Sequence, residues 1–148
     1  MTGLDPEVRR WVAEAPVGRL ATVGSGGRPH IVPVTFFLDG DEIASAVDHK
    51  PKTTTDLKRL RNIEANPAAS VLVDHYEADW SRLWWVRADG NARVLTSGER
   101  RERAVAGLLE KYPLYRKTPP EGPVIVLAVT RWSSWSAGAR RHAGDVQG

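Results

Sequence analysis

A basic, hydroxyl-rich turn that leads into a helix is the part of this chain best suited to chemistry. Residues 50–61 contain five basic side chains and one acid, a local charge balance of +4. Thr53, Thr54 and Thr55 stand where the following helix leaves its first backbone N–H groups unpaired. Unpaired N–H groups, the positive end of a helix dipole, lysines and hydroxyls together form a site for a phosphate group. A solvated helix face with a threonine cap explains the same residues, so the turn alone leaves both interpretations open.

The segments on either side of this turn must hold it in place. Apolar residues 43–47 before it predict a strand. After it, Leu57, Leu60 and Ile63 recur on one side of a short amphipathic helix. This helix is expected to end near Pro67, because the residue before a proline disfavours helical backbone. The basic turn therefore joins a strand to a helix.

The rest of the pattern predicts a mainly β (α+β) protein with one domain over residues 1–148 and a polar tail from about residue 138. Strands are expected at residues 19–23, 30–38, 42–47, 69–74, 83–95 and 124–132, and helices at residues 5–15, at residues 98–112 and after the basic turn. Tight turns join the first three strands, so these strands must be antiparallel neighbours. A sheet of short strands in a domain of this size usually curls into a barrel or a sandwich. A proline-rich link at residues 113–123 is expected to lead to the last strand.

Composition narrows the class of protein. The chain has no cysteine, which excludes disulfides and thiolate metal sites and favours a cytoplasmic location. We expect neither a secretory signal nor a membrane span, because no apolar run approaches about 20 residues. The net charge of +3 is a mild excess, which favours anionic partners without demanding nucleic acid.

Self-contained catalytic groups are not apparent. The four histidines, His30, His49, His75 and His142, lack the spacing of metal ligands, so no metal site is expected. The glycines at residues 24–27 precede a strand instead of a helix, which indicates a hairpin and not a phosphate loop. If the protein is an enzyme, a bound cofactor is therefore expected to carry the chemistry.

Six tryptophans are many for a chain of 148 residues. Trp84 and Trp85 are adjacent on an expected strand, so their side chains must face opposite sides. One can pack inside, and the other must meet a ligand, a second subunit or water. A wide core that needs large side chains is the alternative explanation.

Three stretches of the sequence carry a resemblance to a known superfamily. They are L-A-T followed by G-x-P-x-x-x-P within residues 18–34, K-x-K-T before a helix and Asn66-Pro67 within residues 50–74, and residues 84–94. Over about residues 5–135 the chain resembles the flavin and deazaflavin oxidoreductases of the pyridoxamine 5′-phosphate oxidase superfamily. It is most similar to the actinobacterial branch that uses coenzyme F-420, a deazaflavin with a phosphate and an oligoglutamate tail. The resemblance implies a six-stranded antiparallel split β-barrel of the FMN-binding type, with about three short helices.

The same resemblance implies a cofactor site at the interface of a homodimer. The K-x-K-T turn would grip the cofactor phosphate, and a nearby strand would lie against the ring. The implied contacts are Lys50, Lys52, Thr53 and Thr54 for the phosphate, Val32, Pro33, Val34 and Thr35 for the ring, Trp84, Trp85 and Arg87 from the second subunit, and Lys58, Arg61 and Arg140 for the glutamate tail. Ordinary surface charge is the alternative explanation for Lys58 and Arg61, and it is the preferred explanation for Arg140.

The function implied is F-420-dependent hydride transfer to an electron-poor small molecule. FMN in the same fold and a non-catalytic cofactor carrier remain alternatives, and neither nucleic acid nor a membrane is an expected partner. The catalytic residues stay unassigned, because Tyr76, His75 and His30 are each only candidates for a proton donor and solvent can serve instead.

Overall fold

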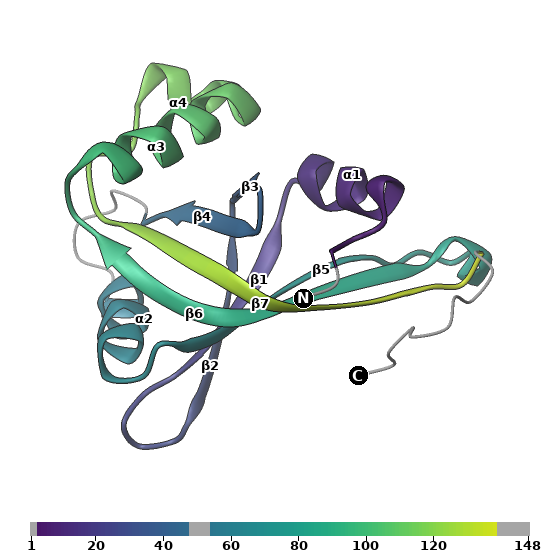
Figure 1. The fold of residues 1–148 in the computed structure, drawn as a ribbon, viewed down its shortest axis with the longest axis horizontal. Coiled ribbons are helices and arrows are strands. Elements are labelled where there is room, and N and C mark those ends of the chain that lie inside the picture. The colour runs from purple at the N-terminus through teal and green to yellow at the C-terminus, as the bar shows by residue number, and fades with distance from the viewer. Residues whose placement is uncertain (1–2, 48–53, 139–148) are drawn as a thin grey trace.

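The protein is built on one antiparallel sheet of seven strands in the order β2-β1-β5-β6-β7-β4-β3 (Figure 1). The computed structural model describes residues 3–47 and 54–138, with the backbone alone at residues 54–57. The strands are β1 Gly18–Val23, β2 Pro29–Val34, β3 Phe37–Asp39, β4 Glu42–Ala46, β5 Ala68–His75, β6 Trp84–Leu95 and β7 Val124–Ser136. The helices are α1 Pro6–Glu14, α2 Thr54–Ala65, α3 Glu99–Lys111 and α4 Pro113–Lys117, with a 3-10 turn at Trp80–Arg82.

A bend at Thr35 and Phe36 explains why seven strands are found where six were expected. The single strand predicted at residues 30–38 is divided there into β2 and β3. These two pieces are the opposite edges of the sheet, yet only two residues separate them. Because consecutive Cα atoms are about 3.8 Å apart, the two edges cannot be more than about 11 Å apart at this point. The sheet must therefore curl, as the sequence predicts.

The helix count was also too low. The link expected at residues 113–123 contains α4, which begins with Pro113. Proline is favoured at the first position of a helix, because the backbone N–H that it lacks has no partner there. The other expected helices are found, and α1 has the predicted cap, since Asp5 Oδ1 accepts a hydrogen bond from the Glu7 backbone N–H at 2.9 Å.

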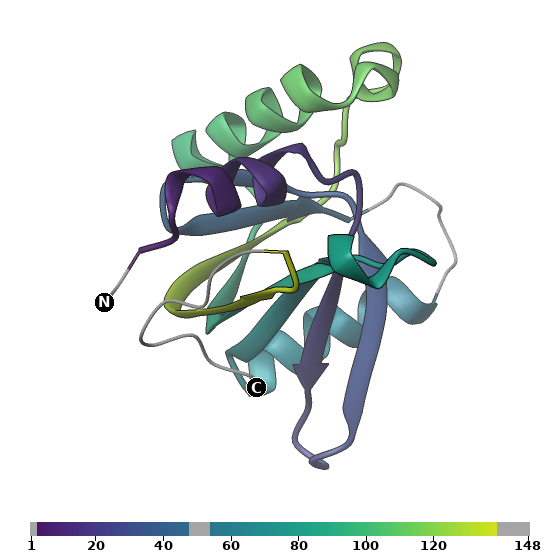
Figure 2. The same cartoon turned by 90° about the vertical axis from the view of Figure 1, so that its right-hand side faces the viewer.

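The inside of the curl holds the core. Its largest fully buried side chains include Phe36, Leu20 and Leu127, with Val12 of α1 packed among them. A second cluster lies between α3 and the strands β4 and β7, around Leu108. Figures 1 and 2 place α3 and α4 at one end of the curl and the β1–β2 hairpin at the opposite end.

A bulge in β7 lies opposite the middle of the long strand β6. The pairing of the two strands shifts register between Asp89 and Gly90, because Thr130 of β7 is an extra residue between the partners Val129 and Arg131. A Cβ at Gly90 would collide with the backbone carbonyl of Ala128, so the close approach of the two strands requires glycine. The half of β6 before the bulge pairs with β5 and belongs to the face described next.

Candidate functional site

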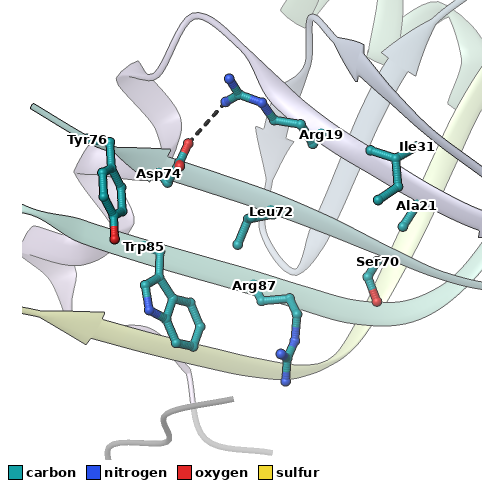
Figure 3. Close-up of a pocket in the computed structure, with 9 residues that line it drawn as sticks. All are labelled: Arg19, Ala21, Ile31, Ser70, Leu72, Asp74, Tyr76, Trp85 and Arg87. Carbon is teal, nitrogen blue, oxygen red and sulfur yellow. Dashed lines mark hydrogen bonds and ion pairs between the residues drawn. The ribbon is translucent and has the colours of Figure 1, made fainter.

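A groove of about 570 Å³ lies on the outer face of the sheet, across β2, β1, β5 and β6 (Figure 3). Its lining consists of Arg19, Ala21, Ile31, Ser70, Leu72, Asp74, Tyr76, Trp85 and Arg87. Strand register sets several of these side chains in cross-strand rows, with Ile31, Ala21 and Ser70 in one row and Arg19, Leu72 and Arg87 in the next. The site is therefore a product of period-two alternation on four strands.

The floor of this groove is apolar and open to solvent. Ile31 is 64% exposed and Leu72 is 37% exposed, although both belong to regular strands. Trp85 adds an indole ring at one side of the floor (Figure 3). Contiguous exposed apolar surface on a sheet is typical of a binding site or an interface.

Two guanidinium groups stand over this apolar floor. Arg19 Nη1 lies 3.0 Å from Asp74 Oδ1, and this ion pair crosses from β1 to β5. Arg87 Nε lies 3.3 Å from Asp89 Oδ2, and its guanidinium carbon is 6.0 Å from the centre of the Trp85 ring. Solvent-exposed pairs of this kind contribute about 1 kcal/mol or less to stability, so they leave both cations available to an anionic ligand.

The two adjacent tryptophans face opposite sides, as predicted. Trp85 lines the groove, whereas Trp84 packs against the core and against Trp11 of α1, with ring centroids 5.3 Å apart. Trp84 also borders a second hollow, which His75 and Arg82 line as well. Trp85 therefore lies in the groove with Arg87, and Trp84 does not.

The basic helix α2 packs against β1 and β6 on the face of the sheet opposite the groove. Ile31 faces the groove, while the neighbouring His30 faces the side of α2, where burial and then the charges of Lys58 and Arg59 lower the pKa of His30. Asn62 of α2 donates a hydrogen bond from Nδ2 to Thr22 Oγ1 of β1 at 3.1 Å, which ties the helix to the sheet. The cationic helix and the apolar groove therefore lie on opposite faces of the same strands, near the edge formed by β2.

Comparison with known proteins agrees with this geometry. The sequence profile described as pyridoxamine 5′-phosphate oxidase matches residues 4–136 of the chain. The chain belongs to this family. The superfamily inferred from the three sequence stretches is thereby confirmed.

Several relatives share the sequence or the fold of this family member. A Streptomyces rimosus protein, "5a,11a-dehydrotetracycline/5a,11a-dehydrooxytetracycline reductase", is 33% identical over 87 residues, which are 58% of this chain and 60% of that protein. Among solved structures, the conserved hypothetical protein Rv2991 from Mycobacterium tuberculosis has a TM-score of 0.69 at 19% identity, covering 99% of this chain and 95% of its own. The heme storage protein HutZ from Vibrio cholerae has a TM-score of 0.68 at 18% identity, covering 91% and 95%. An FAD-binding protein from Mesorhizobium loti has a TM-score of 0.66 at 20% identity, covering 88% and 94%.

Apart from Trp84, the residues that the family resemblance implied fall into four groups. Trp85 and Arg87 lie together in the groove, and Lys58 and Arg61 are exposed on α2. Val32 and Val34 alternate with Pro33 along β2 and lie on the side away from the groove, while Thr35 lies in the bend. Outside the described residues are Lys50, Lys52, Thr53, the Thr54 side chain and Arg140.

Sequence reasoning missed much of the groove. Ile31, Leu72 and Arg19 were not proposed as site residues, although Ile31 lies midway between two prolines of the G-x-P-x-x-x-P stretch. Proline on a strand indicates an edge, and the same parity places Pro29, Ile31 and Pro33 on one face. The spacing of Pro29, Ile31 and Pro33 could therefore have predicted that Ile31 lies on an exposed face of an edge strand.

The candidate proton donors are also separated by the fold. Tyr76 is 73% exposed and lines the end of the groove. His75 forms a hydrogen bond with Glu77 and lies beside the second hollow, and His30 faces away from the groove. Within residues 3–47 and 54–138, no cluster of side chains has the composition of a metal site, and no helix is long and apolar enough to cross a membrane.

Proposed function

We propose that this protein binds coenzyme F-420 and transfers a hydride between the reduced cofactor and an electron-poor small molecule, as a homodimer. The observation that carries the proposal is that an apolar groove and a basic helix lie on opposite faces of the strands beside edge strand β2, where Ile31 faces the groove and His30 faces the helix. A flat redox cofactor with an anionic tail matches these two features, because its ring suits the apolar groove and its tail suits the basic helix. The Streptomyces rimosus relative, a reductase by name, supports an oxidoreductase, although the chain spans only 60% of its length.

The groove suits a flat ring. Its volume of about 570 Å³ lies within the range of about 300–1,000 Å³ that is typical of small-molecule pockets. Ile31 and Leu72 supply an apolar surface, and Trp85 of a second copy would supply an aromatic one. Covering this surface with a planar ligand removes apolar area from water, which is favourable by about 25 cal/mol per Å².

The free edge of β2 suits the polar rim of such a ring. An edge strand accommodates proline where the missing N–H would have pointed away from the neighbouring strand. Pro29 and Pro33 are at such positions on β2, and Ile31 shares their parity. We therefore expect the backbone N–H and C=O of Ile31 to point away from β1, where they can pair with the amide groups of a flavin or deazaflavin.

The basic helix suits the anionic end. Lys58 and Arg61 are exposed, and Nδ1 of His30 is buried without a hydrogen-bond partner among the described residues. A buried nitrogen of this kind costs free energy unless a ligand or water satisfies it. F-420 carries carboxylates beyond its phosphate, so the surplus of cations on α2 favours F-420 over FMN, which is the alternative cofactor.

A second copy of the chain would complete the site. The exposed apolar face around Ile31 and Leu72 is self-complementary in character, which a twofold interface requires. In such a dimer Trp85 and Arg87 of one copy would approach the cofactor of the other. The homodimer would also exclude water from the ring.

The reaction requires orientation, a dry site and a proton. When bound, the reduced cofactor supplies the hydride, and the substrate is reduced by that hydride and one proton. Ile31 and Leu72 would keep water from the ring, and Arg87 would orient an electron-rich oxygen of the substrate. The phenol of Tyr76 would hold the proton at the end of the groove and regain it from solvent.

Titration of the purified protein with F-420 and with FMN tests the proposal. We expect saturable binding of F-420, followed by ligand fluorescence, with weaker binding of FMN. Binding of FMN alone would identify the alternative cofactor. Tight F-420 binding without oxidation of the reduced cofactor by any member of a broad panel of enones and quinones would identify a carrier. No binding of either cofactor would contradict the whole proposal.

A further inference from the structure

The side chain of Arg87 in the groove is held by a carboxylate of its own strand. Its Nε atom lies 3.3 Å from Oδ2 of Asp89, two residues further along the same face of β6. The side chains of Arg87 and Asp89 are only 32% and 31% exposed, although both lie on the outer face of the sheet. Among the described residues, no hydrogen bond engages the terminal nitrogens of Arg87, Nη1 and Nη2. The guanidinium group is therefore anchored at Nε and has a free end.

Asp89 is fixed in turn by two neighbouring strands. The Ser70 hydroxyl on β5 donates a hydrogen bond to Oδ1 of Asp89 at 2.5 Å, so each carboxylate oxygen has a partner. The backbone carbonyl of Asp89 accepts a hydrogen bond at 3.2 Å from Oγ1 of Thr130, the extra residue in the bulge of β7. A bulge changes the direction of the side chains beside it. Ser70 and the bulge therefore determine where the Asp89 carboxylate holds Arg87.

A guanidinium group held in this way suits one class of ligand. With Nε engaged, the two terminal nitrogens still present parallel N–H groups, whose spacing matches the two oxygens of a carboxylate. The centre of the Trp85 ring lies 6.0 Å from the guanidinium carbon of Arg87, and Leu72 is the cross-strand partner of Arg87 (Figure 3). Arg87 thus offers a cationic end beside an aromatic and an apolar surface of the same groove.

Arg19, the other cation of the groove, is held differently. Its terminal nitrogen Nη1 lies 3.0 Å from Oδ1 of Asp74, and its side chain is 48% exposed. One of its two terminal nitrogens is thus already bound, and less of its side chain is covered by neighbours. Arg87 is therefore the better prepared of the two to grip a carboxylate with both terminal nitrogens.

We infer that Arg87 binds a carboxylate group of the substrate and that Asp89 is the positioning residue that holds Arg87 for this contact. The inference rests on the proposed function, and it narrows the substrates to flat, electron-poor molecules that carry a carboxylate. An ion pair open to solvent contributes little to stability, so folding does not explain the Arg87–Asp89 pair. A guanidinium group that is already oriented loses less conformational entropy when the anion binds.

Calorimetric titration of the full chain with naphthoate and naphthamide tests the site without the cofactor. The two probes share one ring system and differ in charge. We expect naphthoate to bind at least about 10-fold more tightly, because only the carboxylate forms charge-assisted hydrogen bonds with Arg87. Arg87→Gln should remove this preference, whereas Arg82→Gln, a change beside the second hollow, should keep it. Equal binding of the two probes by the wild type would overturn the inference.

For Asp89, charge and positioning predict effects of opposite sign. Asp89→Asn removes a negative charge near the bound anion, so charge alone predicts tighter naphthoate binding. Positioning predicts binding that is weaker by about 3- to 10-fold, with naphthamide unaffected, because Arg87 loses its anchor. Asp74→Asn removes the same charge from the same groove and, as the matched control, should tighten naphthoate binding slightly. Unchanged or tighter binding in Asp89→Asn would overturn the positioning role.

Ser70→Ala tests the same role without changing any charge. It removes only the hydrogen bond to Asp89, so we expect naphthoate to bind about 2- to 5-fold more weakly and naphthamide to bind as before. Circular dichroism checks the fold of both variants. If Asp89→Asn does not fold, Ser70→Ala decides, and unchanged naphthoate binding there would overturn the positioning role.

Turnover tests whether the contact selects the substrate. Reduction of the enone in benzoylacrylate or benzoylacrylamide takes a hydride from reduced F-420 and one proton from solvent, and it yields the saturated ketone and oxidised F-420. The amide withdraws electrons more strongly than the carboxylate, so intrinsic reactivity favours the amide. We expect the wild type instead to favour the carboxylate at least about 10-fold in kcat/KM, mainly through KM, and Arg87→Gln to favour the amide. A wild type that favours the amide would overturn the inference.

The outcomes distinguish this inference from the proposed function. A protein that binds F-420 but binds naphthoate and naphthamide equally would overturn the inference and leave the proposed function standing. A protein that prefers naphthoate through Arg87 but binds neither F-420 nor FMN would overturn the proposed function, while supporting the carboxylate site.

Discussion

The two faces of the strand layer β2-β1-β5-β6 are made by the same strands and have opposite characters. On the inner face, Val71, Val73 and Val86 are between 1% and 3% exposed. On the outer face, residues of the same strands, such as Leu72, stay open to solvent and carry charged neighbours. The apolar side chains of the inner face are explained by folding, because folding buries them. Folding does not explain the apolar side chains on the outer face, which stay in contact with solvent, so they indicate a binding surface.

Cations show the same contrast. Lys111 is on the interior side, with Nζ 3.7 Å from the centre of the buried Phe36 ring, and burial lowers its pKa to about 8. Arg19 and Arg87 on the outer face remain accessible and pair with surface carboxylates. A cation that the fold has desolvated affects the stability of the folded chain. A cation that stays hydrated at the surface can instead bind an anionic ligand.

The largest expected effect compares one leucine from each face. Leu20→Ala on the inner face should lower the free energy of unfolding by about 2–5 kcal/mol, because a fully buried side chain leaves a cavity. Leu72→Ala on the outer face should cost about 1 kcal/mol, because that side chain is already partly in water. Urea unfolding at one protein concentration measures both. Equal costs would contradict the division of roles between the faces.

A charge on the outer face should break the proposed dimer without unfolding the chain. Ile31→Glu places a carboxylate in the apolar floor, so we expect self-association to weaken at least about 100-fold and F-420 binding to fall with it. Sedimentation velocity measures the oligomeric state, and circular dichroism checks the fold. Glu121→Gln, an exposed change far from the groove residues in sequence, is the control. A dimer that survives Ile31→Glu would place the interface elsewhere.

The pH dependence of stability should reveal the buried cation. The pKa of Lys111 is lowered from 10.5 to about 8, so between these values the unfolded chain binds more protons than the folded chain, and stability rises with pH. Relative to Lys111→Met, the wild type should therefore gain about 1–2 kcal/mol between pH 7.5 and 9.5. Denaturant unfolding of both proteins at the two pH values gives this difference. A difference that is flat with pH would show that Lys111 keeps its water.

The smallest expected effect concerns the exposed cations of α2. Lys58→Ala and Arg61→Ala should each weaken F-420 binding about 3- to 10-fold and FMN binding less, because only F-420 has carboxylates beyond the phosphate. High salt should reduce the difference from the wild type. Lys117→Ala removes an exposed cation from α4 and serves as the matched control. If the two substitutions weaken F-420 binding and FMN binding equally, the cations of α2 do not favour F-420 over FMN.

Strand periodicity and turn chemistry account for most of what could be predicted. The expected strands and the opposite faces of Trp84 and Trp85 follow from local alternation, and they are found. The division of residues 30–38 could not be predicted, because Thr35 and Phe36, where the strand is interrupted, both suit a strand. The bend exists because Tyr112 and Lys111, about 75 residues later in the chain, satisfy the backbone of Phe36.

The amino-acid sequence by itself determined the family, the cationic character of the segment before and within α2, and the apolar side that each strand presents. These are local properties, since charge, proline and alternation act within a few residues. Only the tertiary structure decided that Arg19, Leu72 and Arg87 form one row and that α2 packs on the opposite face of these strands from the groove. Strand order and register join positions far apart in the chain, and no local pattern specifies which strand lies beside which.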